Sequence, residues 1–272
     1  MLARTAPYRQ LLSNVPGPGA GVCAVCLAPG AAGGAAGGAA GAAGCAVGGA
    51  VGGAAPGRCA ACRRGPLTAD AVLAVSYSRH LGPVHRALRQ YKRGPVALSR
   101  RLATDLAAVL WRFAAGHEDC LARSAGVERF DIVTVVPPRR RPPGQTRSLV
   151  AVVGAVSPLA ARLRPLLEWR GQGGAGRTGI AADATLTVRR VDPERYRCAR
   201  VRAGAGVLLI DDTWVSGASA QSAAAALKRA GAERVGVLVL GRHVYGRPQA
   251  GRPATPATPA LFDWSRCARH AG

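Results

Sequence analysis

The sequence predicts an α/β protein built on a doubly wound, mainly parallel sheet. Apolar runs rich in Val, Leu and Ile recur at 71–77, 131–136, 207–212 and 235–240. Such runs are typical of strands that are buried on both faces. Stretches with helical spacing of apolar residues separate several of them, which favours parallel strands joined by helical crossovers. Paired cysteines precede the first run and predict a small separate module at the N-terminus.

The cysteines of this module form two pairs, Cys23-x-x-Cys26 and Cys59-x-x-Cys62. A two-residue gap lets the chain turn back and seat two thiolates on one metal ion, and two such pairs complete a tetrahedral zinc site. The sequence therefore predicts a zinc-ribbon-like module over residues 1–70 with a structural zinc ion. Two other interpretations are a single redox-active pair and four unrelated thiols.

The interval between the two cysteine pairs is longer than in an ordinary zinc ribbon, because a Gly/Ala-rich insertion occupies about 30–55. Such a composition buries little surface and predicts a disordered loop that the metal closes. Loop-closure entropy rises slowly with length, so the insertion is compatible with the site. Three cysteines farther along the chain have no partner at a characteristic spacing and are interpreted as ordinary thiols: Cys120, Cys198 and Cys267.

Two helices are expected after the first strand. Apolar residues recur at helical spacing from Leu81 to Tyr91, and the pattern ends at the sequence Lys-Arg-Gly-Pro. A longer apolar face then predicts a helix at about 96–115. The apolar residues of both helices are interpreted as core.

The second strand, at 131–136, runs into the basic loop Pro-Pro-Arg-Arg-Arg-Pro-Pro-Gly. Prolines stiffen this turn and the arginines place positive charge at the end of the strand. Arginine matches phosphate oxygens in a bidentate way, so the loop is a candidate anion site. A solvated, arginine-rich turn is the alternative. A helix is expected next, from about 145 towards 163, and a short strand at 186–190.

The third strand ends in two adjacent carboxylates, Asp211 and Asp212. A short loop of small and hydroxyl residues follows, and an Ala-rich helix is expected at 220–230. Backbone N–H groups and the positive end of the helix dipole converge on such a loop and bind anions. Ligands of open α/β sheets bind at the carboxyl ends of the strands. Because the carboxylates suit neighbouring hydroxyls, a ribose carrying a 5′-phosphate fits both parts.

Two alternatives exist for this strand and loop. One is an ordinary buried strand followed by an Asp-capped turn. The other is a receiver domain, in which an acidic pair also follows an apolar strand. That pair opens a domain of roughly a hundred residues or more, whereas only residues 213–272 follow here.

The stretch 207–219 resembles the signature of the type I phosphoribosyltransferases, which bind phosphoribosyl pyrophosphate (PRPP). The resemblance implies that Asp211 and Asp212 are the catalytic pair that holds the ribose. It also implies a PRPP-binding loop, with a departure at Val215, where the pattern usually has a hydroxyl residue. That loop consists of Thr213, Trp214, Val215, Ser216, Gly217, Ala218 and Ser219.

The order of the motifs is similar to that of the ComF-type (competence-associated) phosphoribosyltransferases over about residues 20–245. The paired cysteines, the stretch from Tyr77 to Lys92, a Val-Pro loop and the late PRPP signature carry this likeness. It implies a phosphoribosyltransferase-like domain at 71–245 that transfers phosphoribose to a nitrogen nucleophile, with magnesium, and releases pyrophosphate. It also implies a pyrophosphate loop made of Pro137, Pro138, Arg139, Arg140 and Arg141.

One departure concerns the second substrate. The family usually continues with an Arg-Gly-Phe-Asn-Gln-like run, of which only Gly144 and Gln145 are present here. The departures at this run and at Val215 would suit a regulatory protein that binds PRPP without turnover. No motif identifies the nitrogen acceptor, a general base or an oligomeric state.

The C-terminal part supplies the fourth strand at 235–240. His243 follows it and is either a group at the ligand edge or a surface histidine. Residues 246–272 form a Pro/Ala-rich tail, in which the stretch 261–264 is a candidate docking anchor.

The overall charge adds one more function class. The chain has 37 Lys and Arg against 14 Asp and Glu, a formal net charge of +23. This charge suggests DNA binding through a basic surface, and the resemblance to the competence-associated family implies a DNA-uptake accessory protein as an alternative function. Aromatic residues are only 4%, which disfavours a stacking platform for single strands. No apolar run approaches the ~20 residues of a membrane span, and the N-terminus lacks the core of a secretory signal. We therefore expect a cytoplasmic protein with reduced thiols and no membrane insertion.

Overall fold

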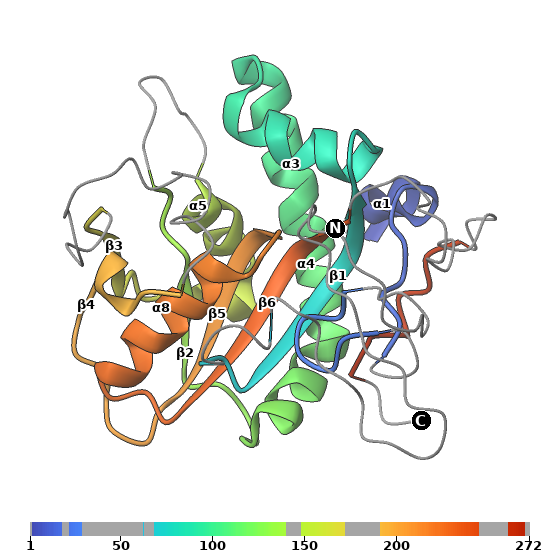
Figure 1. Cartoon of the computed structure of the whole chain (residues 1–272). Helices are drawn as coiled ribbons and strands as arrows, with labels where there is room; N and C mark the ends of the chain where they lie inside the picture. Colours follow the sequence, from blue (N-terminus) through green and yellow to red (C-terminus); the bar gives the residue numbers. More distant parts are fainter. Residues whose placement is uncertain are drawn as a thin grey trace, which may run out of the picture.

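The computed structural model of the chain describes residues 2–17, 22–28, 62, 68–139, 148–171, 191–244 and 261–269. Its centre is a four-stranded sheet in the order β1-β6-β5-β2, in which every neighbouring pair is parallel (Figure 1). The four strands are β1 (Ala71–Arg79), β2 (Ile132–Val135), β5 (Gly206–Trp214) and β6 (Arg234–Val244). The predicted mainly parallel α/β architecture is thereby confirmed.

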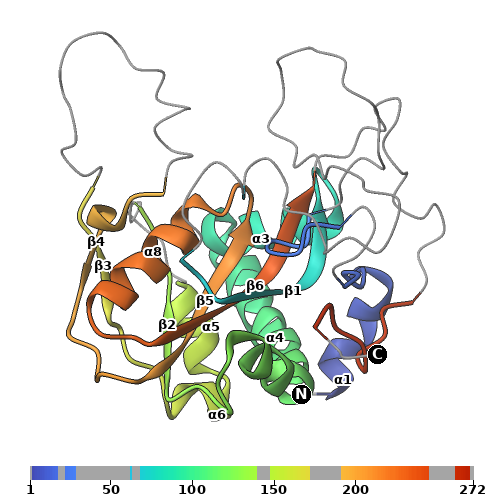
Figure 2. The same cartoon turned by 60° about the horizontal axis from the view of Figure 1, so that its bottom comes forward.

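Helices cover both faces of this sheet. Helices α3 (Pro83–Arg93) and α4 (Val96–Ala125) follow β1 and pack on one face, whereas α8 (Ala218–Arg229) joins β5 to β6 across the other (Figures 1 and 2). The absence of a side chain at Gly236 of β6 allows Phe130 and Leu121 of α4 to pack directly against this strand. A Cβ atom there would lie 2.3 Å from the Phe130 ring and 3.3 Å from Leu121.

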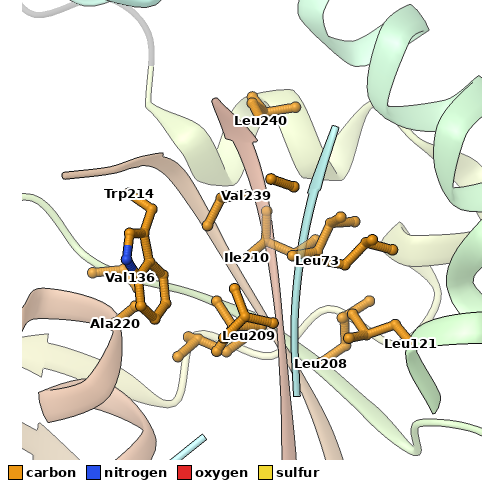
Figure 3. Close-up of a cluster of buried hydrophobic side chains, with 14 of the residues drawn as sticks. Leu73, Leu121, Val136, Leu208, Leu209, Ile210, Trp214, Ala220, Val239 and Leu240 are labelled. Atoms are coloured by element: carbon orange, nitrogen blue, oxygen red, sulfur yellow. The ribbon is translucent and has the colours of Figure 1, made fainter. Parts of the chain in front are cut away.

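The core lies on both sides of the central strands, as the continuous apolar runs require. Leu208, Leu209 and Ile210 of β5 are all fully buried. Figure 3 shows Leu208 on the side of Leu121 in α4, while Trp214 lies with the first turn of α8 on the opposite side. Apolar residues of this strand therefore pack on both faces of the sheet.

Two helices differ from the sequence-based expectation. Helix α4 continues to Ala125, past its expected end near 115, because Cys120, Leu121 and Ala122 bury a further turn, and it stops at Gly126 with φ +83°. The single helix expected at 145–163 is two short ones, α5 (Leu149–Gly154) and α6 (Ser157–Ala160), with residues 145–147 outside the described part. Pro158 explains the break, since a proline in a helix interior removes a hydrogen bond and clashes with the preceding turn.

A small antiparallel hairpin was not expected from the sequence. Strands β3 (Leu167–Trp169) and β4 (Tyr196–Cys198) pair beside α8, and the 3-10 turn η2 (Pro193–Arg195) leads into β4. The rings of Trp169 and Tyr196 meet edge to face at 5.4 Å, so a tertiary contact supports strands too short to have a clear sequence pattern. The strand expected at 186–190 lies outside the described residues.

Both ends of the chain pack near α4. Helix α1 (Leu2–Thr5) and the 3-10 turn η1 (Ala6–Gln10) are held by Asp105 of α4, which accepts hydrogen bonds from Arg4 Nη1 at 2.9 Å and from the Tyr8 hydroxyl at 3.0 Å. The candidate anchor near the C-terminus docks beside them, with Phe262 fully buried and its N–H bonded to the Arg9 carbonyl at 2.8 Å. No helix among the described residues has both the length and the apolarity needed to cross a bilayer.

Candidate functional site

The two adjacent carboxylates lie at the carboxyl end of β5, and α3 fixes one of them. Asp212 is buried and accepts a 2.7 Å hydrogen bond from the Tyr91 hydroxyl. Lys92 forms an ion pair with the same carboxylate oxygen. Burial, and next the charge of Asp212, raise the pKa of the Tyr91 phenol well above its usual range, so Tyr91 stays a donor. Asp212 therefore has a set orientation before any ligand arrives.

Asp211 has a different environment. Its Oδ1 accepts the Asp212 backbone N–H at 2.8 Å. Burial raises the pKa of Asp211 to about 7, the negative charge of Asp212 adds to the rise, and Lys92 opposes it. Burial and a neighbouring negative charge both disfavour the ionised form of a carboxyl group, which accounts for the direction of this shift.

The loop after β5 requires glycine at position 217. Gly217 has φ +82°, and a Cβ atom there would lie 2.2 Å from the Trp214 ring. Trp214 is 1% exposed and packs beneath the loop, so its indole determines how close the loop backbone lies to the sheet. Gly217 is also the N-cap of the twelve-residue helix α8, whose positive end faces the loop. The first-turn N–H groups of a helix have no intrahelical acceptor and suit an anion.

The loop after β2 meets the loop after β5 through an arginine. Arg139 Nη2 donates to Ser219 Oγ at 2.9 Å, and the guanidinium lies 5.8 Å from the centroid of the Trp169 ring. A cation thus stands over the first turn of α8, where an anion would bind. Arg140 and Arg141 lie outside the described residues.

A cavity of about 470 Å³ joins these groups. From the sequence-predicted set it is lined by Pro137, Pro138, Arg139, Asp211, Asp212, Thr213 and Ser219. Of the described residues in the predicted PRPP loop, five do not line it: Trp214, Val215, Ser216, Gly217 and Ala218. Trp214 is buried below the loop, and Val215, 47% exposed, faces a neighbouring recess. Further lining residues that sequence reasoning did not single out as site residues are Tyr91, Lys92, Arg93, Ser148, Leu149 and Tyr196.

Tyr91 and Lys92 belong to the site, although the local sequence pattern predicted a core residue and a helix end at these positions. The helical spacing of α3 explains Tyr91 as core, and its ring is indeed 1% exposed while its hydroxyl points to Asp212. The run Lys-Arg-Gly-Pro was interpreted as a helix end. The sequence signal for this pair was the stretch from Tyr77 to Lys92, which carries part of the resemblance to the ComF-type family, but no residue in it was assigned to the site.

A second recess of about 390 Å³ shares Lys92, Arg93 and Thr213 with the first cavity. Three histidines line it, and the rings of His85 and His243 are 5.0 Å apart. Burial, with the neighbouring imidazoles, lowers the pKa of His243 to about 4. His243 is therefore neutral at pH 7, and it is buried at the end of β6 and not a surface histidine.

Arg242 connects the site to the N-terminal cysteines. Its side chain is buried and donates from Nη1 to the carbonyl oxygens of Trp214 at 3.1 Å and Val215 at 3.0 Å. From Nε it donates to the Cys26 carbonyl at 2.9 Å, and Nη2 lies 3.6 Å from Cys26 Sγ. One side chain thus links the start of the loop after β5 with the cysteine turn.

The cysteine turn brings together three of the four predicted zinc ligands. Cys23, Cys26 and Cys62 are buried with sulfur atoms within 4.8 Å of one another, and Cys59 lies outside the described residues. Tetrahedral zinc with Zn–S bonds of about 2.3 Å needs sulfurs about 3.8 Å apart. Two guanidinium groups border the cluster: Arg242 contacts Cys26, and Arg269 Nη2 donates to the carbonyl oxygen of residue 24 at 3.1 Å. Cysteine sulfurs are soft ligands of the kind that zinc binds, and the two guanidinium groups would balance the negative charge of the thiolates.

Comparison with known proteins gives little. No family model matches the sequence, and no curated protein matches it. One solved structure with some likeness is described as the allosteric regulatory enzyme of purine biosynthesis, with 25% identity and a TM-score of 0.27. The match covers 51% of this chain and 26% of that one, so this chain spans about a quarter of its length. The α/β architecture itself is compatible with a phosphoribosyltransferase-like fold.

Proposed function

We propose that the protein binds PRPP together with Mg²⁺ and transfers phosphoribose to a nitrogen nucleophile, releasing pyrophosphate. One observation carries the proposal: the acidic pair, Arg139, and the residues Thr213 and Ser219 on either side of the loop that leads into α8 line a single cavity at the carboxyl edge of a parallel sheet. Open α/β sheets bind their ligands at this edge. The 470 Å³ volume is within the range of small-molecule sites.

The acidic pair suits the two ribose hydroxyls. Asp212 is oriented by Tyr91 and Lys92, so its remaining acceptor capacity is preset for one hydroxyl. Asp211 supplies the second acceptor and faces the cavity. Their negative potential favours the positive charge that develops at the anomeric carbon while the bond to pyrophosphate breaks and the bond to nitrogen forms.

The positive groups suit the two phosphate ends. The first turn of α8 and the Ser219 hydroxyl would take the 5′-phosphate, while Arg139, Lys92 and Arg93 surround the rest of the cavity and favour pyrophosphate. When bound, Mg²⁺ supplies charge neutralisation for the leaving group, and Asp211 and Asp212 are oxygen donors of the kind it prefers. A carboxylate with a pKa near 7 can also accept the proton that the nitrogen nucleophile loses, a role that falls to Asp211.

A structural zinc ion held by Cys23, Cys26, Cys62 and Cys59 belongs to the same proposal. It would stabilise the turn from which the Cys26 carbonyl contacts Arg242. Its role is to hold the loop side of the site in place.

A second candidate function is PRPP binding without turnover. Val215 favours it, because this exposed apolar side chain occupies the place of a hydroxyl in the resembled signature. Pyrophosphate release with a panel of nitrogen acceptors separates the two functions, since only an enzyme releases it.

The decisive experiment is calorimetry of PRPP with Mg²⁺ on the full chain. Asp211→Asn/Asp212→Asn should reduce the affinity at least tenfold, while Asp119→Asn, an exposed carboxylate on α4, should leave it unchanged. Circular dichroism establishes that each variant is folded. Failure of the folded native protein to bind PRPP would overturn both the transferase and the regulatory function.

A further inference from the structure

We propose that His117, Cys120 and Cys267 form a second metal site, which fastens the C-terminal segment 261–269 to helix α4. One donor atom from each residue lies within 4.8 Å of the other two. His117 and Cys120 are buried and three residues apart, so they share one face of α4. Cys267 is half-buried and arrives from the other end of the chain. Tertiary packing alone brings the three together.

The histidine has the tautomer that metal binding requires. His117 Nε2 lies 2.9 Å from the backbone carbonyl oxygen of Trp264. A carbonyl only accepts, so Nε2 carries the proton and Nδ1 carries the lone pair. Metal-binding histidines characteristically donate their other ring nitrogen to a carbonyl or carboxylate in this way. The Phe113 ring, with its centroid 4.7 Å from that of the imidazole, further limits its rotation.

Two cysteine sulfurs and a histidine nitrogen favour a thiophilic metal ion, and we assign Zn²⁺ to this site. Two thiolates and one imidazole form a three-ligand zinc set with a fourth position for water. Tetrahedral ligand atoms lie about 3.8 Å apart, so the observed cluster, with no separation above 4.8 Å, needs only a small contraction. Arg123 Nη2 lies 3.8 Å from Cys120 Sγ and offers a hydrogen bond to the sulfur.

The proposed ion would secure a segment that contacts several parts of the molecule. Trp264 packs beneath the Arg112 guanidinium at 4.6 Å, and Asn14 exchanges hydrogen bonds with the backbone of Asp263. Arg269 donates to the Val72 carbonyl at 3.0 Å and also to carbonyls of the cysteine turn. A metal cross-link between this segment and α4 would therefore also support the first cysteine cluster.

Metal content of the full chain, purified with reductant and dialysed, tests the site. Cys267→Ser is expected to lower the zinc content by about one ion per chain, and Cys120→Ser by the same amount. Cys198→Ser, a half-buried cysteine outside both clusters, is the matched control and should retain the native content. Cys23→Ser/Cys26→Ser should remove a different ion, so the loss on Cys267→Ser should persist in that background. This readout does not depend on PRPP binding.

Cobalt substitution gives a second readout. The thiolate-to-metal absorption of the Co²⁺-loaded protein should weaken in Cys267→Ser and stay unchanged in Cys198→Ser. Native zinc content in a folded Cys267→Ser protein would overturn the proposal. So would a Cys120–Cys267 disulfide in the reductant-treated native protein, seen by mass spectrometry as the loss of two hydrogens. Cys267 is half-buried whereas Cys120 is buried, so the Cys267 variant decides the question even where Cys120→Ser does not fold.

Discussion

Replacing Arg242 with methionine tests the link between the cysteine turn and the loop after β5. Methionine fills much of the volume of the side chain but donates no hydrogen bond. The change removes donors from the carbonyl oxygens of Cys26, Trp214, Val215 and His243, which Arg242 contacts at 2.7–3.1 Å. Val215 is exposed, so water can replace the donor there, whereas the other three residues are buried.

The expected cost follows from those three buried carbonyls. A buried polar group that loses its partner costs about 1–3 kcal/mol. Removing the buried charge also removes its desolvation penalty, which offsets part of the loss. We therefore expect a decrease of about 3 kcal/mol in the free energy of unfolding. For a protein of this size 1 kcal/mol corresponds to about 2–4 °C, so the melting temperature should fall by about 6–12 °C.

Thermal unfolding and PRPP calorimetry on the same samples measure both consequences. PRPP affinity should fall at least tenfold, because Arg242 holds the carbonyl oxygens of Trp214 and Val215 at the start of the loop that is proposed to bind the 5′-phosphate. Arg234→Met is the control: this side chain is 46% exposed and pairs with Asp70 at 3.4 Å, so its change should cost well under 1 kcal/mol. Equal melting temperatures for the two variants would refute the reasoning.

Three other changes probe the site. Gly217→Ala forces a left-handed conformation that costs about 1–2 kcal/mol and places a Cβ against Trp214, so PRPP titration should show at least tenfold weaker binding. Tyr91→Phe removes a hydrogen bond to a charged group, worth about 1.5–3 kcal/mol, and should lower both the melting temperature and the PRPP affinity. Because the pKa of Asp211 is raised to about 7, its carboxylate forms as pH rises from 6 to 8. PRPP·Mg²⁺ affinity should rise over that interval, and the rise should be smaller in Asp211→Asn.

Each of these changes has a control or a contradicting result. Gly171→Ala has a similar backbone penalty, at φ +109°, with no atom within 4 Å of the new Cβ, and should leave PRPP binding unchanged. A Tyr91→Phe protein with native affinity would show that Asp212 needs no orientation. An Asp211→Asn protein with the native pH profile would mean that PRPP itself, and not Asp211, titrates. The raised pKa also predicts that the contribution of Asp211 to stability declines between about pH 4 and pH 7, since the unfolded chain ionises first.

The strands and the carboxylate loop could be predicted because their signals are local. Four Val/Leu-rich runs identified the parallel sheet, since a strand buried on both faces needs apolar residues at every position. Asp211 and Gly217 lie within seven residues of one another, and strand, loop and helix follow in a fixed order there. Boundaries were less predictable: α4 extends to Ala125, nearly three turns past its expected end, because residues of these turns are buried against the rest of the fold.

The groups that complete the site could not be predicted in this way, because they lie far apart along the chain. Tyr91 reaches Asp212 from another element, and Arg242 joins residues 26 and 214. Tertiary packing likewise turns Cys120 and Cys267, ordinary thiols by spacing, into neighbours of His117. Local sequence determined the sheet, the acidic pair and the glycine-containing loop that leads into α8, because backbone preference and burial act within a few residues. Only the folded chain decided which distant side chains orient and connect them, because such contacts depend on how whole elements pack.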